Sequence, residues 1–132
     1  MATLELRIDW SDLDLFGHVN NVAYFKYIQA ARVGFCEQVG LTSMNEKGKP
    51  GFIIAATNCI FKKPLHFPGS IFVHTELEWI KNTSFRINHK VCDKTGETCA
   101  EAHDVLVVFD YELNQAVPVS ETLRVLMEEK TA

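Results

Sequence analysis

One long segment with helical periodicity constrains the fold of this chain most. Apolar side chains recur between Asn21 and Val39 at spacings of four, three, four and four residues: Tyr24, Ile28, Ala31, Phe35 and Val39. Other apolar residues lie off this stripe, and Gly40 follows it where a left-handed residue often ends a helix. A helix that is apolar on most sides must be buried, and a small chain can bury it by wrapping a sheet around it.

The rest of the chain shows strand patterns. Residues 4–10 (LELRIDW) alternate apolar and charged residues, which predicts a half-buried strand with Trp10 on its apolar face. Residues 52–61 (FIIAATNCIF) form a nearly continuous apolar run, typical of a strand buried on both faces. Residues 71–80, 84–92 and 97–112 are separated by turn residues, so they predict an antiparallel meander.

The order of these elements predicts the architecture. A turn-rich segment, residues 41–51, follows the long helix, and Ser120 is placed to cap a short final helix. We therefore expect an α+β fold, with a curved antiparallel five-stranded sheet around one long central helix in a single domain, residues 1–132. One helix leaves apolar sheet surface uncovered, which favours a homodimer or homotetramer.

Composition excludes several classes of protein. The formal net charge is −4 and basic residues are scattered, which disfavours nucleic acid as a partner. No apolar run predicts a membrane span, and the N-terminus lacks signal-peptide features, so a cytoplasmic location is expected. The four cysteines form no CxxC pair and are expected to be reduced packing residues, with Cys92 opposite Glu97. We predict no metal site and no cofactor.

Polar residues gather just before the long helix, in the stretch DLDLFGHVNN. The first N–H groups of a helix are unpaired and carry partial positive charge, so they can polarise a carbonyl group at Asn21. Asp14 could then act as a nucleophile or as a general base for water, and Gly17 permits a tight turn between them. Asp and Asn are also common helix caps, so a purely structural role remains open at this point.

The longer stretch DLDLFGHVNNVAYFKYIQAAR, residues 12–32, resembles the signature of hotdog-fold acyl thioesterases of the 4-hydroxybenzoyl-CoA thioesterase type. The resemblance covers most of the chain. It implies that a curved sheet wraps a central helix, that two subunits join their sheets edge to edge, and that the substrate is an acyl-CoA. Coenzyme A is then part of the substrate and no separate cofactor is needed.

The resemblance also implies roles for individual residues. Asp14 matches the catalytic carboxylate, and Asn21 matches the position whose backbone N–H faces the thioester carbonyl; relatives of the YbgC type carry histidine there. His18 matches the histidine of the HVNN motif in plant acyl-ACP thioesterases. Those enzymes have asparagine two residues after the acid, where this chain has Phe16, so His18 is expected to assist only by hydrogen bonding or to shape the loop.

Candidate substrate-binding residues lie on both sides of the expected site. Tyr24 is expected in the core or the pocket wall, and Phe25, Ile54 or Phe61 could line the acyl slot. Lys62 and Lys63 could bind the phosphates of coenzyme A, although surface lysines are common at strand ends. Lys81 and Arg86 are weaker candidates.

One acidic and one basic residue near the site are expected to have structural and not catalytic roles. Asp12 would order the loop by accepting backbone N–H groups. Arg32 would bond a nearby carboxylate, with Asp12 as one option, or lie at the surface.

Other functional classes remain as alternatives. HFPG, residues 66–69, resembles the catalytic segment of hotdog 3-hydroxyacyl dehydratases, but here it precedes a strand, which favours a turn with His66 on its rim. A non-catalytic module binding acyl-CoA or acyl-carrier protein, or an acyl-ACP thioesterase, would use the same fold. His74, His89 and His103 show no metal-ligand spacing and are expected at the surface.

Overall fold

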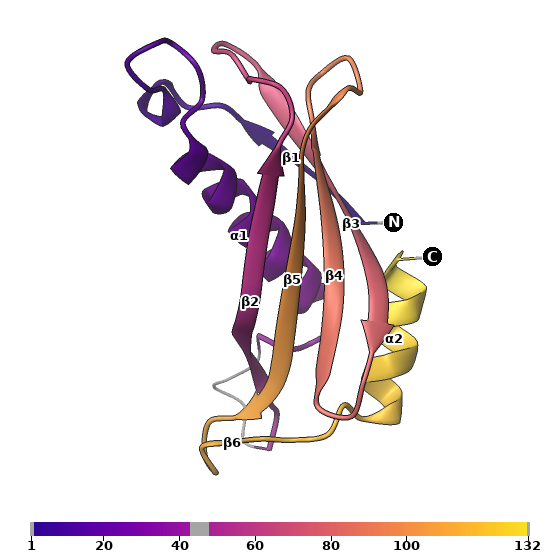
Figure 1. Cartoon of the computed structure of the whole chain (residues 1–132). Helices are drawn as coiled ribbons and strands as arrows, with labels where there is room; N and C mark the ends of the chain where they lie inside the picture. Colours follow the sequence, from indigo (N-terminus) through magenta and orange to yellow (C-terminus); the bar gives the residue numbers. More distant parts are fainter. Residues whose placement is uncertain (1, 43–47, 132) are drawn as a thin grey trace.

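The computed structural model describes residues 2–42 and 48–131, and its elements follow the predicted order (Figure 1). Part of the predicted turn-rich segment, residues 43–47, lies outside the described residues. The helices and strands are β1 (Ala2–Arg7), the short 3-10 helix η1 (Trp10–Asp12), α1 (Asn21–Gln38), β2 (Gly51–Phe61), β3 (Ser70–Ile80), β4 (Ser84–Cys92), β5 (Thr98–Asp110), β6 (Gln115–Ala116) and α2 (Glu121–Thr131).

All strands join one curved antiparallel sheet, in the order β1-β3-β4-β5-β2. The sheet has six strands and not five, because the chain reverses after β5 and Gln115–Ala116 (β6) pairs with Phe109 and Asp110. Asn114 at this reversal adopts a positive φ of 55°, which Asn tolerates better than most residues. The predicted β3-β4-β5 meander is confirmed. Strand β2 pairs with β5 on the side opposite to β4 and forms one edge of the sheet.

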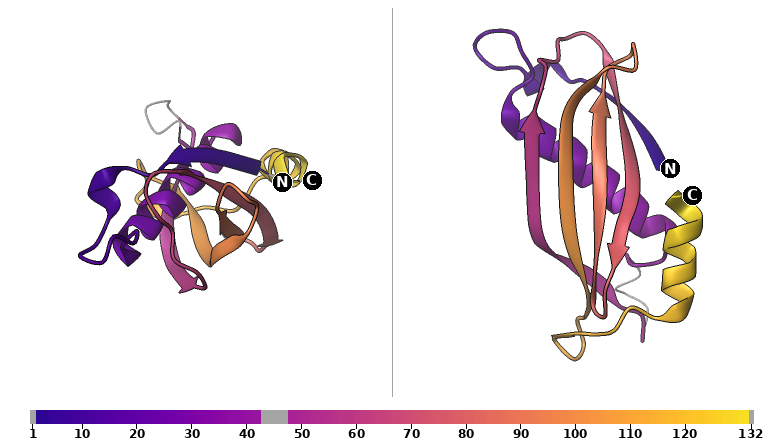
Figure 2. Two further views of the ribbon diagram at one scale, coloured as in Figure 1. Left: turned by 90° about the horizontal axis from the view of Figure 1, so that it is seen from above. Right: turned by 45° about the vertical axis from the view of Figure 1, so that its right-hand side comes forward.

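Helix α1 lies across one face of the sheet, and α2 lies beside β3 at the end that α1 leaves uncovered (Figures 1 and 2). The expected fold with one long helix against the sheet is therefore incomplete, because the second helix, α2, also packs against the sheet. Ser120 caps α2 as expected, since its Oγ accepts a hydrogen bond from the Leu123 N–H at 3.1 Å. Leu123 and Met127 of α2 bury against the same cluster as Phe35 of α1.

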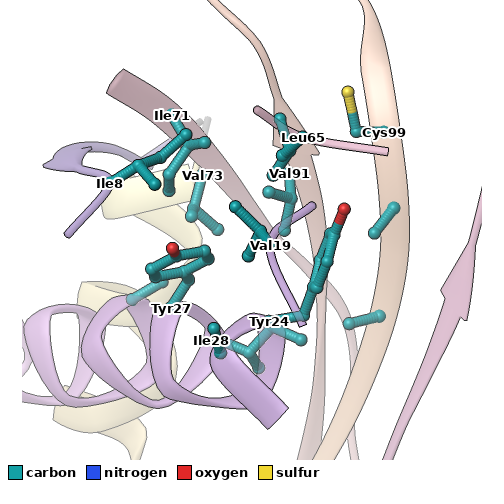
Figure 3. Packing of buried hydrophobic residues seen from close by; sticks show 14 residues of the cluster. Ile8, Val19, Tyr24, Tyr27, Ile28, Leu65, Ile71, Val73, Val91 and Cys99 are labelled. Carbon is teal, nitrogen blue, oxygen red and sulfur yellow. The ribbon is translucent and has the colours of Figure 1, made fainter. Parts of the chain in front are cut away.

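The core consists of two clusters that follow the stripe of α1. Near the start of the helix, Tyr24, Tyr27 and Ile28 belong to one buried cluster with Val73 and Val91 of the sheet (Figure 3). Near its end, Phe35 and its neighbours pack against inward-facing residues of β4 and β5. The helical period predicted from the sequence thus buries the expected side chains, each of which contributes roughly 1.5–3 kcal/mol when fully buried.

Two strand predictions were wrong in detail. The first strand ends at Arg7, because Asp9 and Asp12 form a capping box that turns the chain into η1, and Trp10 is 73% exposed instead of facing the core. The apolar strand β2 is not buried on both faces. It lies at the edge of the sheet, and most of its residues are exposed in the single chain.

The cysteines behave largely as expected. All four are free thiols: Cys36, Cys92 and Cys99 are buried, and Cys59 is half-buried. A register shift places Cys92 opposite Thr98 and not opposite Glu97. Burial raises the pKa of the Cys36 thiol to about 12, so this group is a packing residue at neutral pH.

Candidate active site

The loop before α1 is folded around the carboxylate of Asp14. Its Oδ1 accepts hydrogen bonds from the backbone N–H groups of Phe16 at 2.8 Å and His18 at 3.1 Å. The Asp14 N–H in turn donates to the His18 carbonyl at 2.7 Å, and Gly17 has a φ of +79°, the left-handed conformation expected of it. Oδ2 makes no hydrogen bond to any described residue, so it is available to a bound molecule.

The start of α1 is fixed by Asn20 and presents Asn21. The Asn20 side chain caps the helix by accepting from the Ala23 N–H at 3.0 Å, and the Asn20 N–H donates to the Asp12 carbonyl at 2.9 Å. Asn21 is the first helical residue, and its N–H makes no hydrogen bond within the described parts of the chain. An unpaired donor therefore stands at the positive end of the helix dipole.

A cleft of about 300 Å³ lies between this loop and the end of β2. It brings together most of the predicted site residues. The exceptions are Phe25, which is 37% exposed, Ile54, and the weaker candidates Lys81 and Arg86, none of which lines the cleft. The lining residues are Asp14, His18, Val19, Asn21, Tyr24, Phe61, Lys62, Lys63 and Pro64. The carboxylate and the helix N-terminus thus face one space.

Tyr24 forms the inner wall of the cleft. Its ring lies next to Val19 and extends toward the strand that carries Cys99 (Figure 3). It is 3% exposed, its hydroxyl donates to the Lys63 carbonyl at 3.2 Å, and its ring meets Phe61 edge-on with centroids 5.1 Å apart. Burial raises the pKa of Tyr24 to about 12, which suits a neutral wall residue and not a proton donor.

The two lysines at the cleft are already paired with carboxylates. Lys62 forms an ion pair with Glu101 at 3.2 Å, and Lys63 forms one with Glu97. The hydrogen bond from Lys63 to Glu97 raises the pKa of the lysine, which keeps its charge at neutral pH. Both lysines line the cleft. To bind a phosphate, each would first have to release its carboxylate partner.

Asp12 orders the loop by accepting a backbone N–H, as expected, and it also binds two side chains. It is buried, and its Oδ2 accepts from the Asp9 N–H at 3.0 Å and from the Tyr27 hydroxyl at 2.8 Å, while Lys26 pairs with Oδ1. Burial alone would raise its pKa, but the hydrogen bonds from Lys26, Tyr27 and the Asp9 backbone outweigh burial and lower it. Arg32 does not reach Asp12.

Replacing Tyr27 with phenylalanine should destabilise the protein by about 1.5–3 kcal/mol, because a buried carboxylate loses one of its donors. Tyr111→Phe is a matched control, since the Tyr111 hydroxyl donates to a neutral carbonyl, that of Phe52, at an exposed position, where we expect about 1 kcal/mol or less. Chemical denaturation at neutral pH measures both losses. Equal losses would show that Asp12 does not depend on Tyr27.

His66 is a neighbour of the site that the sequence did not predict. His18 and His66 form an isolated antiparallel bridge, and their rings meet edge-on with centroids 4.9 Å apart. His66 does lie on the exposed segment before β3, as expected, but pairing of that segment with the loop before α1 brings it to His18. The sequence carries no signal for this contact, because it depends on a bridge between distant segments.

A buried polar network behind the site was also missed. Arg32 donates to both oxygens of Asp104, at 2.9 and 3.1 Å, and Thr57 donates to Asp104 Oδ1 at 2.7 Å. His89 is 1% exposed, not at the surface as expected, and its Nε2 lies 2.7 Å from Asp104 Oδ2 while its Nδ1 lies 2.8 Å from Thr75 Oγ1. Burial of Asp104 opposes its charge, but hydrogen bonds from His89 and Arg32 outweigh that and lower its pKa to about 2.

The alternation of β4 and β5 could have revealed this network. Phe85, Ile87, His89 and Val91 share one face of β4, so His89 belongs to the apolar face. Asp104 stands between inward-facing Ala102 and Leu106 in the same way. A charged residue on such a face needs a buried partner, and Arg32 of α1 supplies it.

Two further properties concern membranes and metals. No described helix has the length and apolar character needed to cross a membrane. Among residues 2–42 and 48–131, no cluster of three or more His, Cys, Asp or Glu side chains is suited to a metal ion.

Comparison with known proteins assigns the family. The sequence profile of the Thioesterase-like superfamily matches residues 8–126, so this chain belongs to that superfamily. The fold is accordingly the hotdog-like thioesterase fold, and the described residues form an antiparallel sheet of six strands with the α-helices α1 and α2. The uncharacterised protein YsmA of Bacillus subtilis is 21% identical over 113 residues, which is 86% of this chain and 76% of YsmA.

Solved structures agree with this assignment. A gentisyl-coenzyme A thioesterase has 28% sequence identity and a TM-score of 0.80, over 96% of this chain and 98% of that one. A thioesterase from Thermus thermophilus, solved with coenzyme A and zinc, has a TM-score of 0.84 over 98% of this chain and 92% of that one. At 23% identity this second likeness concerns the fold alone.

Proposed function

We propose that this protein is an acyl-CoA thioesterase, which hydrolyses a thioester to a carboxylic acid and coenzyme A. The observation that carries the proposal is the convergence of Asp14, His18 and the N–H of Asn21 on one cleft. Membership of a thioesterase superfamily supports the general activity. The assignment of individual roles rests on the geometry of the site and on the motif that it contains.

The arrangement favours attack on a carbonyl carbon. Two backbone N–H groups hold Asp14 through Oδ1, so Oδ2 is the atom that would attack the thioester carbon or take a proton from water. The thioester oxygen would accept a hydrogen bond from the Asn21 N–H, and the helix dipole would stabilise the charge that develops on it. His18 would assist by hydrogen bonding at the rim of the cleft.

Coenzyme A is the proposed carrier. A gentisyl-coenzyme A thioesterase is among the similar structures, and the Thermus thermophilus thioesterase holds coenzyme A. Lys62 and Lys63 line the cleft and would bind the phosphates after release of Glu101 and Glu97. No other cofactor is needed for this reaction, because water is the second reactant.

The experiment is to measure thiol release from acetyl-, hexanoyl-, dodecanoyl- and benzoyl-CoA by the purified protein. Turnover of at least one of them, with stoichiometric free acid, would support the proposal. Absence of turnover, together with tight binding of acyl-CoA in calorimetry, would favour a non-catalytic binding module instead. Turnover only of the same acyl groups on acyl-carrier protein would identify an acyl-ACP thioesterase.

The protein is proposed to act as a homo-oligomer in the cytoplasm. The edge strand β2 exposes unpaired backbone groups and large apolar side chains, including Ile53, Ile54 and Ile60. Pairing of β2 with β2 of a second copy would cover them. Sedimentation velocity measures the assembly, and a dimer or tetramer is the expected species.

A further inference from the structure

We infer that Phe61 limits the length of the acyl group that the site accepts, so that the preferred substrates carry short or compact acyl groups. This inference rests on the proposed thioesterase activity and adds a residue that determines specificity. Phe61 is the last residue of β2, and it lines the same cleft as Asp14 and Asn21.

The position of Phe61 in the sheet directs its ring into the cleft. Phe61 pairs with Ala100 of β5, which is fully buried, so both residues belong to the sheet face that α1 covers. Its ring makes a T-shaped contact with the Tyr24 ring, and the Tyr24 hydroxyl is itself held by the Lys63 carbonyl. An acyl group that starts at the Asn21 N–H therefore meets an aromatic wall built from one helical and one strand residue.

Beyond this wall the inner face of β2 carries small side chains. Cys59 pairs with Ala102 there, and Cys59 is only partly buried. The next inward-facing residue is Thr57, whose hydroxyl is bound to Asp104. Removal of the Phe61 ring would therefore extend the site along β2, past Cys59, as far as the hydrogen-bonded Thr57.

Phe61 can be replaced without disturbing the chemistry or the core. Its side chain is 47% exposed in the single chain, whereas Tyr24 is almost fully buried. Asp14, His18 and Asn21 belong to a different segment, whose contacts are held by hydrogen bonds that do not involve Phe61. A change at Phe61 should therefore alter the ratio of activities toward different acyl groups.

The test compares kcat/KM for acetyl-, hexanoyl- and dodecanoyl-CoA in the wild type, Phe61→Ala and Phe61→Leu. We expect the wild type to favour the two shorter substrates over dodecanoyl-CoA by at least about tenfold. Phe61→Ala should shift this ratio toward dodecanoyl-CoA by about tenfold or more, because each newly buried methylene is worth about fourfold. Phe61→Leu should give a smaller shift in the same direction.

Ile60→Ala is the matched control. Ile60 is the neighbouring residue on the same strand, is 55% exposed, and pairs with Glu101 on the opposite face of the sheet. Ile60→Ala should keep the wild-type ratio of kcat/KM between the shorter substrates and dodecanoyl-CoA. An unchanged ratio in both folded Phe61 variants, or a wild type that prefers dodecanoyl-CoA, would overturn the inference while leaving the thioesterase activity intact. If the wild type hydrolyses no thioester at all, the proposed function is refuted, and this inference with it.

Discussion

Asp14→Asn should lower kcat for thioester hydrolysis by about 10²–10⁴-fold while leaving the fold unchanged. The amide oxygen of asparagine can still accept from the N–H groups of Phe16 and His18, so the loop should keep its shape. What disappears is the negative charge of Oδ2, which either attack on the carbonyl or activation of water requires. Steady-state kinetics with the best substrate of the panel measure the change, and circular dichroism checks the fold.

Asp93→Asn is a close structural match for this experiment. Asp93 Oδ1 accepts from backbone N–H groups two and four residues ahead, those of Thr95 and Glu97, as Asp14 Oδ1 does in its own loop. Asp93 does not line the cleft that holds Asp14. Loss of activity in Asp14→Asn but not in Asp93→Asn would separate the chemical role from the structural one. Equal activity in the wild type and folded Asp14→Asn would remove Asp14 from the mechanism.

Asp104→Asn should have the largest effect on stability, a loss of about 3–5 kcal/mol in the free energy of unfolding at neutral pH. The substitution removes the charge that balances Arg32, whose side chain is only 11% exposed. It also changes the partner of His89, which is buried between Thr75 and Asp104. An uncompensated buried cation then remains in the folded state, while the unfolded state leaves it in water.

Urea denaturation of two further variants tests this explanation. Glu128→Gln removes a carboxylate from an exposed position of α2 and should change stability by less than about 0.5 kcal/mol. Arg32→Met combined with Asp104→Asn should recover part of the loss, because no unpaired charge remains. If the double variant is no more stable than Asp104→Asn alone, charge balance is not the reason for the loss.

Local patterns in the sequence predict the type and order of most helices and strands. The stripe of α1 follows from the helical period, the ends of α1 and α2 from Asn20, Gly40 and Ser120, and the meander from turn residues. These signals are local, since each depends on a few neighbouring residues. The stretch from Asp14 to Asn21 could be proposed as a site for the same reason: its chemistry is contiguous in the chain.

Features that depend on pairing between distant segments become visible only in the folded chain. Position in the sheet makes β2 an edge strand, although its composition is that of a central one. Pairing of segments far apart brings His66 to His18, and packing of α1 on the sheet carries Arg32 to Asp104 and away from Asp12. Charged and aromatic side chains have many possible partners in a sequence, and only the folded geometry selects one of them.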